Sequence, residues 1–144
     1  MKGYVCKVCG FVSIDGSIPD KCPACGSPSK AFEEKMDAIK TAKDEEKLSE
    51  KHTPVITVVR KCGLIPEGCA DVHVRIGSVI HPMLPEHYIT AIDFYIDNKF
   101  LARTILTPEK LNPAAALHLK VATGKLSVVE HCNIHGNWIA EQNL

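Results

Sequence analysis

The sequence predicts a mainly β protein: an antiparallel β-sandwich preceded by a small metal-knuckle domain and a short helical linker. Two observations predict this arrangement. Four of the seven cysteines form two Cys-x-x-Cys pairs before residue 26, and from residue 53 onward apolar and polar residues alternate in short segments separated by turns. Such alternation is typical of half-buried strands. We therefore expect three parts, residues 1–35, 36–50 and 51–144.

The first part depends on Cys6, Cys9, Cys22 and Cys25. A chain below about 40 residues rarely folds by apolar burial alone and usually needs a metal or disulfides. Two knuckles of this spacing can supply four thiolates in a tetrahedron, which suits iron or zinc. A glycine follows each pair and lets the backbone turn so that amides point at the sulfur atoms. The pattern predicts a four-thiolate metal site.

The connecting residues 33–50 contain no glycine, proline or aromatic residue. Met36, Ile39 and Ala42 are spaced for a weak apolar stripe on a helix, and most other side chains are charged. We expect a short helix followed by a solvated linker whose charges form a hydrated surface.

Six segments of the last part have the pattern of strands. They are residues 55–59, 70–76, 88–96, 100–106, 115–122 and 125–130. Asp97-Asn98-Lys99 is expected to form the turn of a hairpin between the third and the fourth of them. Six or seven short strands with turns about every ten residues predict an antiparallel sandwich.

Three short segments of the last part together offer four imidazoles and one thiolate. They are Glu50-Lys51-His52, then His81-Pro82-Met83 with His87, and Cys132-Asn133-Ile134-His135. A structural zinc site is usually complete with four ligands. Four nitrogens and one sulfur instead suit a redox-active iron with one coordination position left free. The residues therefore predict an iron centre that can bind a small substrate.

These segments resemble the motifs of superoxide reductases, the desulfoferrodoxin and neelaredoxin family, in the same order and over roughly residues 50–144. The resemblance implies an immunoglobulin-like sandwich and a mononuclear iron. Its ligands would be the four imidazoles and the thiolate of His52, His81, His87, Cys132 and His135. It implies one-electron reduction of superoxide to hydrogen peroxide. Glu50 and Lys51 match the family's catalytic pair, with the lysine near the open face of the iron and the glutamate able to reach the oxidised iron.

The two cysteine pairs resemble rubredoxin, and their short spacing is similar to the rubredoxin-type domain of rubrerythrins. This resemblance implies iron and one-electron transfer. We expect the first domain to relay electrons to the catalytic iron from a donor such as rubredoxin or its reductase. A zinc ribbon that only folds and docks is the alternative. Many desulfoferrodoxins carry a different N-terminal module, in which the last two cysteines are adjacent, and this chain departs from that pattern.

Other functions fit the residues less well. A two-iron electron-transfer protein without oxygen chemistry would gain nothing from a free coordination position or from Glu50 and Lys51. A blue-copper site uses only two histidines. A zinc-ribbon adaptor, whose sandwich binds another macromolecule, would need no iron.

Two groups of residues match no motif. Cys62 and Cys69 enclose an apparent hairpin tip, and they could form a disulfide, bind a metal with a partner chain, or remain free thiols. His73, His118 and His131 are expected to be structural histidines, either satisfied or exposed.

Composition adds few constraints. The formal net charge of zero gives no signal for a nucleic-acid or anionic-membrane partner. No apolar run approaches the roughly 20 residues that span a bilayer, so no membrane partner is expected. Seven cysteines without a secretory signal favour metal ligation in the cytoplasm over a disulfide framework. The resemblance to superoxide reductases implies a homodimer or homotetramer.

Overall fold

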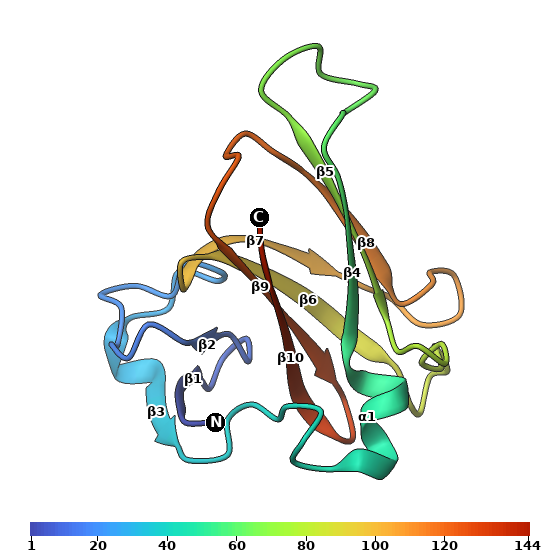
Figure 1. The fold of residues 1–144 in the computed structure, drawn as a ribbon. Helices are drawn as coiled ribbons and strands as arrows, with labels where there is room; N and C mark the ends of the chain where they lie inside the picture. The colour runs from blue at the N-terminus through green and yellow to red at the C-terminus, as the bar shows by residue number, and fades with distance from the viewer.

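The computed structural model describes residues 1–144 and contains three antiparallel sheets and one α-helix, α1 (Glu46–His52). The N-terminal sheet has the order β2-β1-β3, from β1 (Gly3–Cys6), β2 (Val12–Ser13) and β3 (Phe32–Lys35), with a 3-10 turn at Ser29–Ala31. One sheet of the sandwich has the order β10-β9-β6-β7, from β6 (Ile89–Ile96), β7 (Lys99–Ile105), β9 (Lys125–Cys132) and β10 (Gly136–Asn143). The other has the order β4-β5-β8, from β4 (Pro54–Val59), β5 (Ala70–Ile76) and β8 (Ala114–Leu119). The predicted mainly β fold is confirmed (Figure 1).

The main core lies between the two sheets of the sandwich. In β5 the side chains of Val72, Val74 and Ile76 are buried, and those of His73 and Arg75 between them are exposed. This alternation is the pattern that predicted the strand. On the opposing sheet the core includes Ile89, Ile92, Phe94, Leu126 and Val128.

A second core joins the N-terminal domain to the outer face of the four-stranded sheet. Its members from the N-terminal segment include Phe11, Val12, Phe32 and Ile39, and those from the sheet are Tyr95, Val129 and Ile139. The rings of Phe11 and Tyr95 stack with centroids 6.0 Å apart, and the Tyr95 hydroxyl donates a 2.7 Å hydrogen bond to the Val12 carbonyl. The four-stranded sheet is therefore covered on both faces, which makes the N-terminal domain part of the fold.

A buried ion pair lies at this contact between the domain and the sheet. The Asp93 side chain is fully buried and accepts hydrogen bonds from Arg103 Nε (2.6 Å) and Arg103 Nη2 (2.7 Å). His131 Nε2 lies 2.7 Å from the same carboxylate. Burial raises the pKa of Asp93, but the hydrogen bonds and charges of Arg103 and His131 outweigh it and hold that pKa below its usual value. The remaining guanidinium donor, Arg103 Nη1, bonds to the Cys9 carbonyl at 2.7 Å.

The connecting segment differs from its prediction. Residues 33–35 belong to β3, residues 36–45 form turns, and the only helix begins at Glu46. The expectation of a helix followed by a solvated linker is wrong because Ile39, 1% exposed, packs into the second core. Lys40 also pairs with β10, where its amide bonds to the Asn137 carbonyl and its carbonyl accepts from Ile139. These contacts cover the edge of β10 and outweigh a weak helical stripe.

Strand β10 was not predicted. Its residues Trp138 and Ile139 are adjacent and both buried, because one faces the metal-site end of the sandwich and the other faces the N-terminal domain. Where two neighbouring residues of a strand are buried on opposite faces, the alternation of apolar and polar residues is lost at that point. The predicted turn at Asp97-Asn98 is present, and both residues have positive φ as a two-residue hairpin turn requires.

None of the helical residues forms a segment with the length and apolar character needed to cross a bilayer.

The Tyr95→Phe variant tests the attachment of the N-terminal domain. Loss of the hydroxyl leaves the buried Val12 carbonyl without its partner, which costs about 1–3 kcal/mol. A change of 1 kcal/mol corresponds to a melting-temperature shift of about 2–4 °C in a protein of this size. The control Tyr4→Phe removes a hydroxyl that makes no hydrogen bond and is expected to leave the melting temperature unchanged. Equal melting temperatures for Tyr95→Phe and the wild type would contradict the assignment.

Candidate metal centres

Helix α1 positions the first candidate ligand, His52, at its last residue. The His52 side chain is 1% exposed, and Nδ1 lies 2.8 Å from the Leu48 carbonyl one turn earlier. A carbonyl oxygen only accepts, so Nδ1 carries the proton and Nε2 presents a lone pair. Strand β4 begins only two residues later, so His52 lies between the helix end and the sandwich.

The second candidate, His81, follows a turn that packs closely against α1. Gly77 has a φ of +87°, and a side chain there would collide with the Val79 carbonyl and lie 2.8 Å from the Lys51 carbonyl. This close approach brings His81 beside His52. His81 Nδ1 lies 2.7 Å from the Pro82 carbonyl, so its Nε2 also presents a lone pair.

The Nε2 atoms of His52 and His81 lie 3.2 Å apart. With both protons on Nδ1, neither Nε2 can donate to the other, and two facing lone pairs repel. A bound cation would accept both lone pairs. The arrangement therefore fits a metal ion.

His87 supplies an independent test of that fit. Its backbone pairs with Leu84 through two 3.0 Å hydrogen bonds that close the turn at Pro85 and Glu86. Its Nε2 is buried and has no hydrogen-bond partner. Buried polar atoms are almost always satisfied, so an orphaned imidazole nitrogen beside two others indicates a missing ligand partner.

The turn between β9 and β10 contributes Cys132 and His135. Cys132 Sγ accepts a 3.4 Å hydrogen bond from the His135 amide and lies 3.8 Å from His135 Nδ1. Trp138 fixes this turn, because its indole donates to the His135 carbonyl at 3.3 Å and its ring stacks on His52 at 5.1 Å. Cys132 and His135 therefore point to the same place as the three other histidines.

The four imidazoles form a closed square. Neighbouring ring centroids lie 4.7 Å (His52–His81), 4.6 Å (His81–His87), 4.9 Å (His87–His135) and 4.9 Å (His135–His52) apart, whereas His52 and His87 lie 6.2 Å apart across the square. Neighbouring planes are nearly perpendicular, at 72–83°. The donor atoms of His52, His81, His87 and Cys132 all lie within 4.8 Å of one another. His135 lies outside this tightest set and completes the square.

Burial favours the neutral form of His52, His81 and His87 in the metal-free protein. It lowers the pKa of His52 and His87, and it lowers the pKa of His81 from 6.5 to about 4. Neutral imidazole is the form that binds a metal. Burial also raises the pKa of the Cys132 thiol, so metal binding must displace its proton.

Two charged groups flank the square. Glu50 and Lys51 are the exposed residues of α1 just before His52. The positive charge of Lys51 lowers the pKa of His87, after the larger effects of burial and of His135, so its ammonium lies near this corner. Glu130, two residues before Cys132, is fully buried without a hydrogen-bond partner, and burial raises its pKa well above its usual value.

The four N-terminal cysteines form a separate cluster. All four sulfur atoms lie within 4.8 Å of one another, with Cys6 and Cys25 3.8 Å apart and Cys9 and Cys22 3.5 Å apart. Edges of about 3.8 Å are those of a tetrahedron with metal–sulfur bonds of about 2.3 Å. The glycines after the two pairs adopt φ of +76° and +79°, as the sequence predicted for two knuckles.

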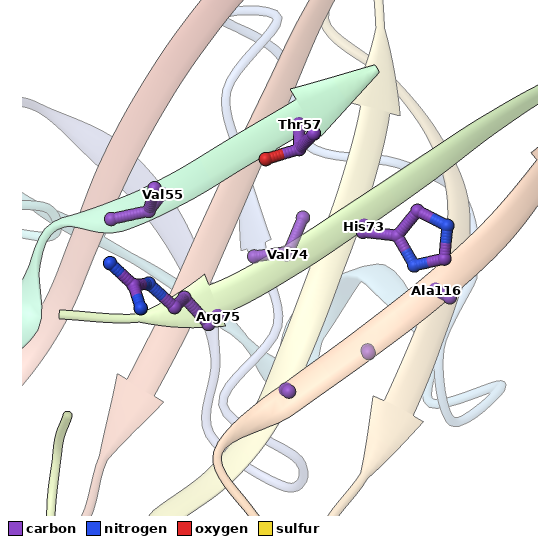
Figure 2. A pocket seen from close by; sticks show the side chains of 8 residues that line it. Val55, Thr57, His73, Val74, Arg75 and Ala116 are labelled. Atoms are coloured by element: carbon purple, nitrogen blue, oxygen red, sulfur yellow. The ribbon is translucent and has the colours of Figure 1, made fainter. Parts of the chain in front are cut away.

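The structure brings together residues that sequence patterns did not connect. Asp71 and His118 lie beside Cys62 and Cys69, and the ligand atoms of all four lie within 4.8 Å of one another. No local motif predicts this cluster, because Asp71 and His118 are brought together only by the register of β5 and β8. His131 is satisfied as a structural histidine, whereas His73 is exposed on the outer face of the three-stranded sheet, in a shallow groove (Figure 2).

Fold and sites define a β-sandwich metalloprotein with a four-histidine, one-thiolate centre and a four-thiolate knuckle domain. Residues 44–141 match the Desulfoferrodoxin family model, and residues 4–33 match that of the rubredoxin-like domain of rubrerythrin. The chain belongs to the desulfoferrodoxin family. It is 37% identical over 139 residues to a desulfoferrodoxin homolog of Archaeoglobus fulgidus, covering 96% of this chain and 94% of that one.

Two further comparisons extend this result. A superoxide reductase of Pyrococcus abyssi is 34% identical over 115 residues, covering 72% of this chain and 96% of the relative. The solved structure of superoxide reductase (neelaredoxin) from Ignicoccus hospitalis superposes with a TM-score of 0.60 at 26% identity, covering 75% of this chain and 94% of that one. The expected family and both expected types of metal site are confirmed.

The metal-free protein is expected to lose stability as the pH falls from about 6.5 towards 4. Over this range the unfolded chain protonates His81, whose pKa is 6.5 when unperturbed, but the folded chain does not, because its pKa there is about 4. The contribution of His81 to the free energy of unfolding is fully present above about pH 6.5. Its loss across this window lowers that free energy by about 3 kcal/mol. The urea concentration at the midpoint of unfolding, measured at several pH values across this window, should fall as the pH falls.

The variants His81→Asn and His73→Asn separate this effect from general acid denaturation. His81→Asn should weaken the pH dependence, and the exposed control His73→Asn should keep it. An unaltered dependence in His81→Asn would refute the assignment.

Proposed function

We propose that this protein reduces superoxide to hydrogen peroxide by one electron, with iron held by His52, His81, His87, His135 and Cys132. One observation carries the proposal: four imidazoles, two of them buried and two half-buried, form a square with a thiol beside it and a lysine at its edge. A square of four nitrogens with one sulfur leaves a sixth position of an octahedral ion free for a small ligand. Iron bound there would supply the one-electron chemistry.

The protein contributes orientation. The carbonyls of Leu48 and Pro82 hold His52 and His81 in the tautomer that directs Nε2 inward. The amide of His135 donates to Cys132 Sγ, which stabilises the thiolate form of this ligand. Trp138 packs on His52 and limits its rotation. These contacts hold the donors close together before a metal binds, so little order is lost on binding.

Lys51 is proposed to attract the substrate anion. Its ammonium is exposed and lies near His87, at the rim of the square. A positive charge beside a small site raises the local concentration of an anion and speeds its encounter. The exposed carboxylate of Glu50, one residue earlier, is proposed to help displace the product.

Lys51→Ala tests the steering role. Superoxide consumption measured by pulse radiolysis at low ionic strength is expected to slow by roughly tenfold, because loss of an adjacent charge removes much of the electrostatic steering. Added salt should slow the wild type and have less effect on the variant. Lys47→Ala, one turn earlier on the same helix, is the control with the same change in net charge.

An unchanged rate constant for Lys51→Ala at low ionic strength would contradict this role. If wild-type protein with full iron occupancy failed to consume superoxide, the alternative of a two-iron electron-transfer protein would replace the proposal.

We further propose that the Cys6, Cys9, Cys22 and Cys25 site holds iron and supplies the reducing electron. A continuous path supports this. The Cys9 carbonyl accepts from Arg103, Arg103 and His131 Nε2 both hydrogen-bond to the Asp93 carboxylate at 2.7 Å, and His131 directly precedes Cys132. Covalent bonds and short hydrogen bonds thus link a candidate ligand of one centre to a candidate ligand of the other.

Cys25→Ser in the full chain tests the relay, because Cys25 is exposed and its loss removes one thiolate from the N-terminal site. Deleting residues 1–35 would instead uncover Tyr95, Val129 and Ile139. The pre-reduced variant should consume superoxide like the wild type in a single turnover. Re-reduction by a rubredoxin-type donor should slow at least about tenfold, which corresponds to about 1.4 kcal/mol in the barrier.

Ser29→Ala, an exposed substitution in the same domain, serves as the control for this test. Re-reduction of Cys25→Ser at the wild-type rate, or a wild-type N-terminal site that holds only zinc, would refute the relay and leave the reductase proposal intact.

The physiological setting is also proposed. The donor is a small redox protein such as rubredoxin or its reductase, and the protein works in the cytoplasm as a homodimer or homotetramer. All seven cysteines are free thiols, which agrees with a reducing compartment.

A further inference from the structure

The loop between β4 and β5 extends beyond the end of the sandwich, where Figure 1 draws it in green. Residues 60–69 contribute none of the turn and loop backbone hydrogen bonds of the protein. A ten-residue loop without such bonds has little local restraint. Apart from Arg60, whose guanidinium donates to the Ala122 carbonyl at 3.0 Å, the side-chain contacts that hold the loop involve two sulfur atoms.

The register of β5 and β8 brings most of the side chains around these sulfur atoms together. Asp71 on β5 lies directly opposite His118 on β8, and both side chains point to the outer face of the three-stranded sheet. Cys69 is two residues before Asp71 and points to the same side. Figure 2 shows the next row of that face, where His73 lies opposite Ala116. The loop then returns Cys62 to the same point.

The four side chains have tetrahedral spacing. His118 Nδ1 lies 3.2 Å from Cys62 Sγ, 3.6 Å from Cys69 Sγ and 2.8 Å from Asp71 Oδ1, and Cys69 Sγ lies 3.7 Å from Asp71 Oδ1. In a tetrahedral zinc site, bonds of about 2.0–2.3 Å give donor–donor edges of about 3.3–3.8 Å. Three of these four distances are within about 0.1 Å of this range, and the shorter His118–Asp71 contact would open slightly around an ion.

We propose that Cys62, Cys69, Asp71 and His118 bind a zinc ion. Two thiolates, one imidazole and one carboxylate complete a four-coordinate zinc site and leave no open position, which is typical of a structural site. Two thiolates and a carboxylate carry a formal charge of −3, which a divalent cation reduces to −1. The ion would fasten the loop to β5 and β8.

The surroundings of Cys62 support the thiolate form. The Ile65 amide donates to Cys62 Sγ at 3.3 Å, from three residues further along the chain. The His135 amide makes the same contact with Cys132 at 3.4 Å. Such amide donors orient and stabilise sulfur ligands.

This cluster is separate from the two centres described above. The square begins at His52, just before β4, and the loop begins after β4 ends at Val59. The six residues of β4 separate them by about 20 Å at about 3.3 Å per residue. Failure of the zinc proposal would leave the proposed reductase function unaffected.

Metal analysis of the iron-loaded full-length protein tests the proposal. After exposure to equimolar zinc and gel filtration, the wild type is expected to hold one zinc per chain more than Cys69→Ser or His118→Gln at equal iron content. His73→Gln, on the same face of β5, is the matched control and should keep the zinc. Loss of a ligand should weaken zinc affinity by at least about 100-fold, the upper range for losing an outer-shell partner.

Thiol alkylation gives a second measurement that does not depend on activity. Zinc should protect Cys62 and Cys69 from alkylation in the wild type, and a chelator should restore their reactivity. The same protection by zinc in His118→Gln would overturn the site. A Cys62–Cys69 disulfide in protein purified under reducing conditions, or equal zinc content in the wild type and His118→Gln, would overturn it as well.

Discussion

The convergence of five donor atoms on one buried point constrains the rest of the structure. Four imidazoles lie with neighbouring centroids 4.6–4.9 Å apart, and the thiol of Cys132 lies beside them. Without a cation, facing lone pairs repel and an orphaned nitrogen is costly. The surrounding fold must therefore hold them together, and it does so with a helix end, a loop containing two prolines and a hairpin turn. Each of these is tied down by backbone hydrogen bonds.

The N-terminal domain belongs to that supporting structure. It covers the outer face of the sheet that carries Cys132, and the segment around Lys40 covers the edge of β10 behind His135. The Asp93–Arg103 pair lies at the same contact and also reaches the Cys9 carbonyl. A buried ion pair contributes more to a unique arrangement than to net stability when all its hydrogen bonds are made. Here it fixes the orientation of one metal-binding domain on the other.

The three clusters share a principle of construction. In two of them a cysteine sulfur, that of Cys62 or Cys132, accepts an amide hydrogen bond from three residues further along the chain. Each of the three clusters takes its remaining donors from one or two further segments that are brought close by strand pairing or by a packed turn. Local sequence therefore supplies part of each site, and the fold supplies the rest. The sites differ in charge: thiolates predominate in two of them and neutral imidazoles in the third.

The sequence by itself determined the strands that alternate, the two knuckles and the residues that meet at the four-histidine centre. Those features rest on local periodicity, on spacing and on motif resemblance, which a single chain displays directly. Only the tertiary structure decided the course of residues 36–45, the presence of β10 and the meeting of His118 with Cys62. Ile39, Trp138 and Ile139 are placed by burial between layers, which removes alternation, and His118 is placed by cross-strand register. Both depend on contacts between residues distant in sequence, and no local pattern encodes them.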